Sequence, residues 1–274
     1  MRILLTILSL SITTFIFAQN LDVEGDIKIS SSGNTTPAPG TIRWTGSDFL
    51  GWNGTKWISL TSGIAFEGEV TDTAGNTYRT ITIGSQEWMA ENLRTTHYAD
   101  GTIIPQVNNN GTWAAANYGA WCWYDTSSNY ELPYGKLYNW YAVNDGRGLC
   151  PNGWHMPSDA EWTTLIDFLD PEVVDPDAIG TQSSVAGGKM KESGTAHWNS
   201  PNTAATNESG FSGLPGGFRF NDGSYITLGN DGYWWSSTES GANAWFRVLF
   251  YSSVDVSRSN NDKRLGFSVR CLRD

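Results

Sequence analysis

One short stretch, Trp154 to Trp162, constrains the fold more than any other part of the chain. Within it, the Ser158 hydroxyl can accept the backbone N–H of Glu161, and the Glu161 carboxylate can reach back to the N–H of Ser158. This reciprocal pairing is a capping box, which begins a helix. The apolar residues that follow recur at helical spacing: Trp162, Leu165, Ile166 and Leu169. We therefore expect an amphipathic helix over residues 158–169.

The chain ahead of residue 62 favours short strands joined by tight turns. Three strands are predicted there, at 41–44, 49–52 and 55–60. Asn53-Gly54 indicates a hairpin turn in which both residues need positive φ. A unit of this size cannot bury Trp52 and Trp57 by itself. We expect it to pack on the main domain or on copies of itself.

A boundary is predicted at Thr61 to Gly63, between a small β unit with its linker (19–62) and a main domain (63–274). The main domain should open with a hairpin formed by 66–71 and 78–83, because apolar and polar residues alternate there. A helical turn is predicted at 87–93. Strands are predicted near the C-terminus, at 233–236, 245–251 and 266–271.

The composition is that of a folded, aromatic-rich chain. Among 274 residues, 30 are Gly and 14 are Trp, and only 16% are charged. Such a chain can bury a large aromatic core and uses many tight turns. The formal net charge of −11 argues against a nucleic-acid partner, because nucleic-acid binding needs a basic surface.

Residues 1–18 have the pattern of a signal peptide. Arg2 supplies a positive start, Ile3 to Phe17 carries no charge, and Ala18 suits cleavage before Gln19. A membrane helix is the alternative, but the stretch is short and no other long apolar run follows. We therefore expect an exported protein that is extracellular, on the cell surface or periplasmic, and that does not span a membrane.

Export makes the three cysteines, Cys122, Cys150 and Cys271, candidates for a disulfide. Three thiols permit one bond and one free residue. Cys150–Cys271 would join the start of the helix to the last predicted strand and close a long loop. Cys122–Cys150 is the main competitor, and three buried reduced thiols are the other alternative.

Several motifs follow one another in order along the main domain. They are Gln86–Arg94, Tyr134–Trp140, Gly148–His155, Ser158–Trp162, Ala186–Lys191, Thr203–Phe211, Leu214–Gly217, Trp234–Thr238 and Gly266–Cys271. With these motifs, residues 66–274 resemble the Fibrobacter succinogenes major paralogous domain, a family of exported bacterial domains. The family has no well-defined activity to transfer, so the resemblance implies an exported domain without a stated reaction.

A wider resemblance bears on the fold. The segment from Pro157 to Trp162 and the ending Gly266–Arg270 look like those of formylglycine-generating-enzyme-like domains. That resemblance implies an α+β, C-type-lectin-like fold, with irregular antiparallel sheets, one or two helices and long loops. In such folds the helix start and the last strand pack together, which favours Cys150–Cys271. The oxidase chemistry does not carry over, because this end of the chain offers one cysteine rather than a reactive pair.

A glycan site would need exposed aromatic faces together with amide and carboxylate groups. The loop from His197 to Glu208 and the segment up to Trp235 offer such groups. The candidate ligand-binding residues are Trp198, Asn202, Asn207, Glu208, Arg219, Trp234 and Trp235. The structural alternative is that these residues hold the loop together and fill the core. Buried tryptophan rings would favour that alternative.

Metal and hydrolytic chemistry have weaker support. Asp222, Asn230 and Asp231 lack the spacing of a calcium loop and are expected to form turns. Neither a nucleophile elbow nor a paired-His metal motif occurs in the sequence, and His155 is expected to be a packed, hydrogen-bonded residue. We therefore expect no enzyme and no cofactor.

Two functions remain in view. The first is a non-catalytic exported domain that binds glycan or another surface molecule. The second is a structural or adhesive surface component, in which the N-terminal β unit forms a homo-oligomer.

Overall fold

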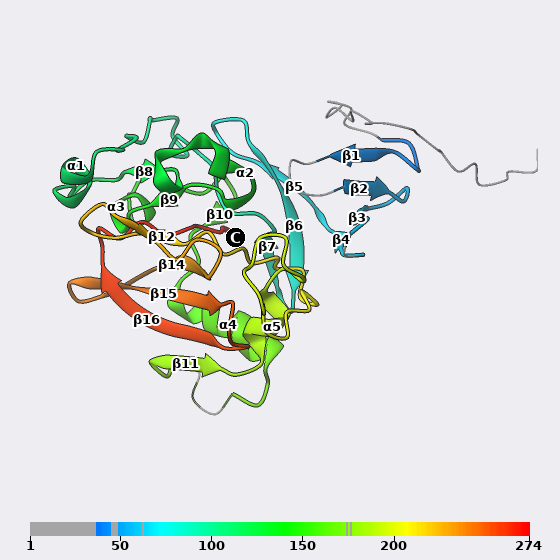
Figure 1. Cartoon of the computed structure of the whole chain (residues 1–274). Coiled ribbons are helices and arrows are strands. Elements are labelled where there is room, and N and C mark those ends of the chain that lie inside the picture. The colour runs from blue at the N-terminus through cyan, green and yellow to red at the C-terminus, as the bar shows by residue number, and fades with distance from the viewer. Residues whose placement is uncertain (1–36, 45–48, 62, 174, 176) are drawn as a thin grey trace, which may run out of the picture.

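The computed structural model describes residues 37–44, 49–61, 63–173, 175 and 177–274. The predicted signal peptide, residues 1–18, lies outside these residues, as does most of the predicted linker. The described chain is an α+β fold of antiparallel sheets with a few short helices (Figure 1). The predicted fold class is therefore confirmed at this level.

A five-stranded sheet joins the two ends of the main domain. Its strands pair in the order β10-β17-β7-β6-β5, all antiparallel. They are β5 (Gly68–Thr71), β6 (Thr77–Ile83), β7 (Gln86–Met89), β10 (Trp154–His155) and β17 (Leu272–Arg273). The hairpin predicted from residues 66–83 is confirmed as β5 and β6.

The helical turn predicted at 87–93 is wrong, because this segment begins inside strand β7. Trp88 pairs with Ile81 of β6 on one side and with Leu272 of β17 on the other. Strand pairing on both sides, with burial of the Trp88 ring, outweighs the local helix preference of the sequence.

A four-stranded antiparallel sheet forms the C-terminal part of the domain. Its order is β11-β16-β15-β14. The strands are β11 (Gly180–Ser183), β14 (Asp231–Ser240), β15 (Asn243–Phe250) and β16 (Val256–Asp262). β14 and β15 contain most of the strands predicted at 233–236 and 245–251. β16 was not predicted, because its polar sequence lacks a recognisable strand pattern.

Short elements complete the main domain. β8 (Trp121–Cys122) pairs with β9 (Leu137–Tyr138), and β12 (Phe218–Arg219) pairs with β13 (Tyr225–Ile226). The short helices are α1 (Asn110–Ala114), α2 (Glu131–Tyr134), α3 (Trp140–Val143) and α5 (Ala186–Met190), and 3-10 turns occupy Tyr124–Thr126 and Ser128–Tyr130.

The predicted amphipathic helix is confirmed as α4 (Asp159–Leu169). Ser158 Oγ accepts the N–H of Glu161 at 3.2 Å, and Glu161 Oε2 accepts the N–H of Ser158 at 2.7 Å. The apolar face of α4 packs between the two larger sheets. There the Trp162 ring lies 4.8 Å from the ring of Trp88 in β7, and the Trp162 indole N–H points to the Trp235 carbonyl in β14.

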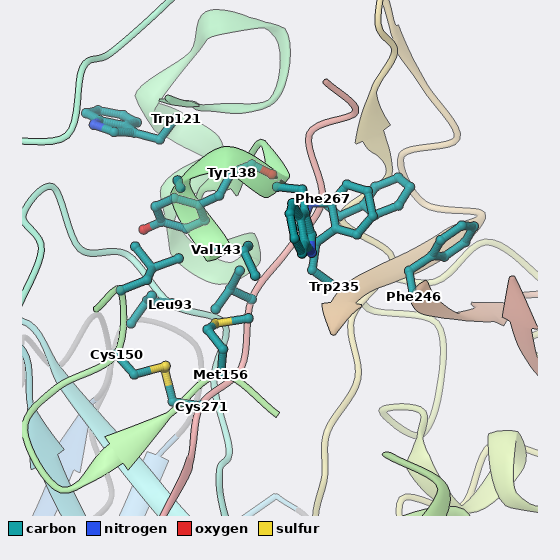
Figure 2. Packing of buried hydrophobic residues seen from close by; sticks show 14 of the residues in the cluster. Leu93, Trp121, Tyr138, Val143, Cys150, Met156, Trp235, Phe246, Phe267 and Cys271 are labelled. Carbon is teal, nitrogen blue, oxygen red and sulfur yellow. Dashed lines mark hydrogen bonds between the residues drawn. A yellow bond between two sulfur atoms is a disulfide. The ribbon is translucent and has the colours of Figure 1, made fainter. Parts of the chain in front are cut away.

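The disulfide between Cys150 and Cys271 is present, with its Cα atoms 5.8 Å apart, and Cys122 is a free, buried thiol. The favoured pairing is therefore confirmed. Figure 2 shows the bond at the edge of an aromatic core that contains Tyr138, Trp235 and Phe267. The bond links the segment before β10 to the end of the chain.

The strand predicted at 266–271 is only partly correct. Gly266, Phe267 and Ser268 each make one isolated bridge, to Arg219, Tyr138 and Trp234 respectively, and regular pairing begins at β17. An extended segment that meets a different neighbour at each residue cannot form a continuous ladder.

The three predicted N-terminal strands join a further strand, β4, in a separate four-stranded sheet with the order β1-β2-β3-β4. They are β1 (Ile42–Trp44), β2 (Phe49–Trp52), β3 (Trp57–Ser59) and β4 (Ala65–Phe66). The sheet extends past the boundary predicted at 61–63, because β4 pairs with β3. It lies to one side of the main domain, next to β5 and β6 (Figure 1).

The turn between β2 and β3 differs from the predicted two-residue hairpin. It spans residues 53–56, and the Asn53 side chain accepts the N–H groups of Thr55 and Lys56 at 2.9 and 2.8 Å. Gly54 has a φ of 102°, whereas Asn53 has no positive φ. The side chain of Asn53 therefore closes this turn without a left-handed Asn53 backbone.

Candidate functional site

The three tryptophans proposed to stack on a glycan lie in the core. Trp198 is 1% exposed, and Trp234 and Trp235 are fully buried. Each indole N–H is also used internally. Trp198 donates to the Gly213 carbonyl at 3.0 Å, Trp234 to Asn92 Oδ1 at 2.8 Å, and Trp235 to the Tyr138 carbonyl at 2.9 Å. A stacking role does not fit these rings, because a sugar cannot reach their faces.

Arg219 is likewise an internal residue rather than a surface contact. Its side chain is fully buried and donates to the carbonyls of Val107, Asn108 and Gly223 at 2.5, 2.8 and 3.0 Å. Its guanidinium group lies between the rings of Trp113 and Tyr225, 4.5 and 4.9 Å from their centroids. Arg219 thus fastens the loop before α1 to the β12–β13 hairpin.

The remaining predicted ligand residues also serve the loop between α5 and β12. Asn202 is 5% exposed and donates to the Glu192 and Gly194 carbonyls. Asn207 is 4% exposed and bonds Ser212 through both side-chain atoms. Glu208 is exposed and pairs with Lys189 at 3.1 Å. These contacts favour the structural alternative for the predicted site.

Several backbone carbonyl oxygens converge near the loop between α5 and β12, and they surround the side chain of a lysine. Lys191 is fully buried, and its Nζ donates to the carbonyls of Thr203, Phe250 and Ser253 at 3.0, 2.9 and 2.7 Å. Burial lowers the pKa of Lys191 to about 8. Among the described residues, no group of three or more His, Cys, Asp and Glu side chains is placed to hold a metal ion.

A pocket of about 300 Å³ lies on the main domain, and Thr61 is its one lining residue from the N-terminal unit. Its charged lining residues contact one another or the backbone. His197 Nδ1 lies 2.8 Å from Glu192 Oε2, and Arg79 pairs with Glu91. Arg270 is fully buried and donates to the Ser212 carbonyl at 2.9 Å, and burial lowers its pKa to about 9. We therefore interpret this pocket as a polar junction between segments of the main domain.

The N-terminal sheet presents a second kind of surface. Alternation along the paired strands places four exposed apolar side chains on one face: Ile42, Trp44, Phe49 and Leu60. They are 49%, 38%, 40% and 54% exposed, and the Trp44 and Phe49 ring centroids lie 4.6 Å apart. We call these four residues the outer sheet face.

Comparison with known families identifies the main domain. The family model of the Fibrobacter succinogenes major domain matches residues 81–273. The chain belongs to this family. No curated protein and no solved structure matches the chain. Within the part of the chain that the structure describes, no helix is both long enough and apolar enough to cross a membrane.

The N-terminal sheet precedes the region matched by the Fibrobacter succinogenes major domain, yet it is attached firmly to it. On the inner face, Leu50 and Phe66 are 0% and 3% exposed and join the core around Trp88. Lys56 pairs with Glu67 at 2.7 Å, and Arg43 pairs with Glu69. Because the inner face is occupied, the outer sheet face is the exposed face of this sheet in the described part of the chain.

A histidine holds the end of the major domain beside α4. His155 Nδ1 lies 2.7 Å from Asp274 Oδ1, and its Nε2 lies 3.0 Å from Glu161 Oε1. Burial favours the neutral ring, but the hydrogen bonds to Asp274 and Glu161 outweigh it, so the pKa of His155 lies above its usual value. The expectation that His155 is a packed, hydrogen-bonded residue agrees with these contacts.

This arrangement predicts a small pH-dependent contribution to stability. A raised folded-state pKa means that the contribution is fully present below about pH 6.5 and is lost as the pH rises through the folded-state pKa. We expect the His155→Gln protein to lose less than about 1 kcal/mol at about pH 5, because the ring is partly exposed, and to match the wild type at about pH 9. Urea unfolding at both pH values measures this difference, and a loss that is larger at the higher pH would contradict it.

Proposed function

We propose that this protein is an exported, non-catalytic bacterial surface component that associates with further copies of itself through the outer sheet face. The observation that carries the proposal is the exposure of four large apolar side chains on one face of one small sheet. Exposed apolar clusters of this kind mark interaction surfaces in soluble proteins. The buried rings of Trp198, Trp234 and Trp235 also favour a structural role over the ligand site first predicted there.

A second copy of the chain is the proposed partner because the surface suits self-pairing. The paired positions of this face contain no charged side chain, so two copies can meet without burying an unpaired charge. Among the described strands, β1 also stands at the edge of the sheet, and an edge strand can accept an identical strand. A twofold interface would bring the same residues together from both copies.

Export and the lectin-like architecture are parts of the same proposal. The uncharged stretch after Arg2 supports export, and so does the Cys150–Cys271 disulfide, since such bonds persist in oxidising compartments. Irregular antiparallel sheets around α4, with the disulfide linking the segment before β10 to the chain end, support a C-type-lectin-like arrangement. Glycan binding is a second candidate function. It is favoured by a groove on the main domain that lies apart from the residues first predicted to bind glycan.

Self-association can be tested with two substitutions on the outer sheet face. We expect the mature wild type to show a concentration-dependent mass above that of one chain. The Trp44→Gln/Leu60→Gln double variant should have the mass of a single chain, because both side chains are exposed and their loss removes apolar contact area. Size-exclusion chromatography with light scattering over a wide concentration range measures the mass.

Phe168→Gln serves as the matched control, since Phe168 is a 59% exposed aromatic residue on α4. It should associate as the wild type does. Point variants are preferable to deletion of residues 19–62, because Leu50 belongs to the main core. A wild type that stays monomeric at every concentration, or a double variant that associates equally well, would refute the proposal.

A further inference from the structure

An open groove on the main domain combines aromatic rings with amide and charged groups. It has a volume of about 460 Å³, within the range of small-ligand sites. Its lining includes Tyr118, Gly119, Tyr141, Asn144, Asp145 and Arg147, and we call it the tyrosine groove. Tyr118 is 44% exposed and Tyr141 is half-buried, so these rings, unlike the three core tryptophans, are accessible from outside.

The two walls of the tyrosine groove are held together by one buried side chain. Asn139 caps α3, and its Oδ1 accepts the N–H of Ala142 at 3.2 Å and that of Ala120 at 2.9 Å. Its amide group donates to the Tyr118 carbonyl at 2.9 Å. The segment carrying Tyr118 and the helix carrying Tyr141 are therefore fixed relative to each other, which lowers the entropic cost of binding.

A closed ion pair forms the polar end of the groove. Arg147 donates to both carboxylate oxygens of Asp145, from Nε at 2.8 Å and from Nη2 at 2.7 Å. The guanidinium group also lies 3.9 Å from the centroid of the Tyr98 ring. Both charges are present but neutralise each other, so the pair offers directed hydrogen-bonding groups without a net charge.

The floor of the groove is closed beneath this pair. Tyr98 is fully buried, and Asp145 and Arg147 lie close to its hydroxyl. The hydroxyl lies directly under the backbone of Gly119, where an added Cβ would come within 2.0 Å of it. A ligand in the groove therefore meets Gly119 rather than the Tyr98 hydroxyl.

We propose that the tyrosine groove binds a neutral sugar residue of a glycan. Tyr118 offers a ring face to the C–H face of the sugar, and planar groups on Asn144, Asp145 and Arg147 bridge adjacent hydroxyls. A neutral ligand is favoured because the ion pair is balanced and the chain has a net charge of −11.

This inference deepens the glycan-binding candidate by assigning it a site, and it is independent of self-association through the outer sheet face. The test uses the mature chain and an array of neutral and acidic oligosaccharides, followed by titration calorimetry with mannan, xylan and β-glucan. We expect binding to one or more neutral probes and weaker binding to alginate and pectin, which are acidic.

Two variants at Tyr118 separate ring stacking from folding. Tyr118→Ala should weaken binding roughly tenfold, as expected for an exposed aromatic anchor. Tyr118→Phe keeps the ring and should bind within about twofold of the wild type. Phe168→Ala, an exposed aromatic residue outside the groove, should not change affinity.

The outcomes distinguish the site from the function. If the folded wild type binds no probe, glycan binding fails and the groove assignment fails with it. If the wild type binds but Tyr118→Ala binds equally well, glycan binding stands and the tyrosine groove is not its site.

Discussion

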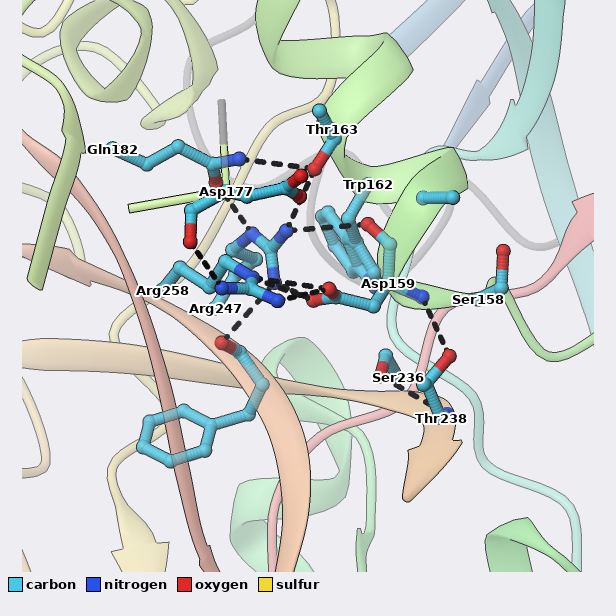
Figure 3. Close-up of polar contacts among 12 residues, drawn as sticks. Ser158, Asp159, Trp162, Thr163, Asp177, Gln182, Ser236, Thr238, Arg247 and Arg258 are labelled. Atoms are coloured by element: carbon cyan, nitrogen blue, oxygen red, sulfur yellow. Dashed lines mark hydrogen bonds and ion pairs between the residues drawn. The ribbon is translucent and has the colours of Figure 1, made fainter. Parts of the chain in front are cut away.

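We expect the Asp159→Asn protein to lose about 3–5 kcal/mol of its free energy of unfolding. Asp159, at the start of α4, is 7% exposed, and its carboxylate faces two buried guanidinium groups (Figure 3). Arg247 Nη1 lies 2.6 Å from Asp159 Oδ1, and Arg258 Nη2 lies 2.6 Å from Asp159 Oδ2. Without the carboxylate, two buried positive charges would face each other with no direct counter-charge.

The contacts of Asp159 also join separate parts of the fold. Arg247 comes from β15 and additionally donates to Gln182 of β11 at 2.7 Å, while Arg258 comes from β16 and donates to the Asp177 carbonyl at 2.5 Å. Burial acts to raise the pKa of Asp159, but the bonds and charges of Arg258 and Arg247 outweigh it and hold the pKa below its usual value. The carboxylate is therefore ionised at neutral pH.

Asp167→Asn is the matched control, because Asp167 is exposed on the same helix and undergoes the same substitution. Its effect should stay within about 0.5 kcal/mol. Adding Arg258→Met to Asp159→Asn should restore part of the loss, because it removes one of the two unpaired charges. Guanidinium unfolding measures all four proteins. A loss below about 1 kcal/mol for Asp159→Asn, equal to that of an ordinary surface change, would show that the network does not stabilise the fold.

We expect removal of the disulfide to cost about 4–5 kcal/mol of unfolding free energy. The bond joins residues 121 positions apart, so it restricts a large part of the unfolded chain. Both cysteines are buried, and alanine at each position leaves a small cavity as well. Chemical unfolding of the Cys150→Ala/Cys271→Ala protein, compared with the wild type without reductant, measures the effect.

Cys122→Ala is the control for loss of a buried sulfur. Cys122 is fully buried and forms no disulfide. Burial raises the pKa of its thiol to about 11, so the thiol stays protonated. The variant should lose about 1 kcal/mol from the smaller side chain. Reductant should destabilise the wild type and the Cys122→Ala protein but not the double variant. Equal sensitivity of all three proteins to reductant would contradict the assignment.

Local sequence patterns were enough to specify the elements that neighbouring residues produce. The capping box and the spacing of four apolar residues defined α4, and alternation defined the β5–β6 hairpin. The turn signal at Asn53-Gly54 marked the short N-terminal strands. Export, with the positions of the cysteines and the family resemblance, favoured the pairing of Cys150 with Cys271. The motifs along the main domain also identified the family. Each of these inferences depends on neighbouring residues or on an ordered series of motifs.

The tertiary structure alone decided which aromatic residues are accessible. Trp234 and Tyr118 carry equally suitable rings, but the first is buried between sheets and the second is exposed beside a groove. Pairing partners far apart in sequence likewise made a strand of the segment around Trp88 and of polar β16. The same holds for the buried arginines, whose acceptors come from distant loops. Local patterns specify the propensity of a segment, whereas its burial depends on the surfaces that the rest of the chain places against it.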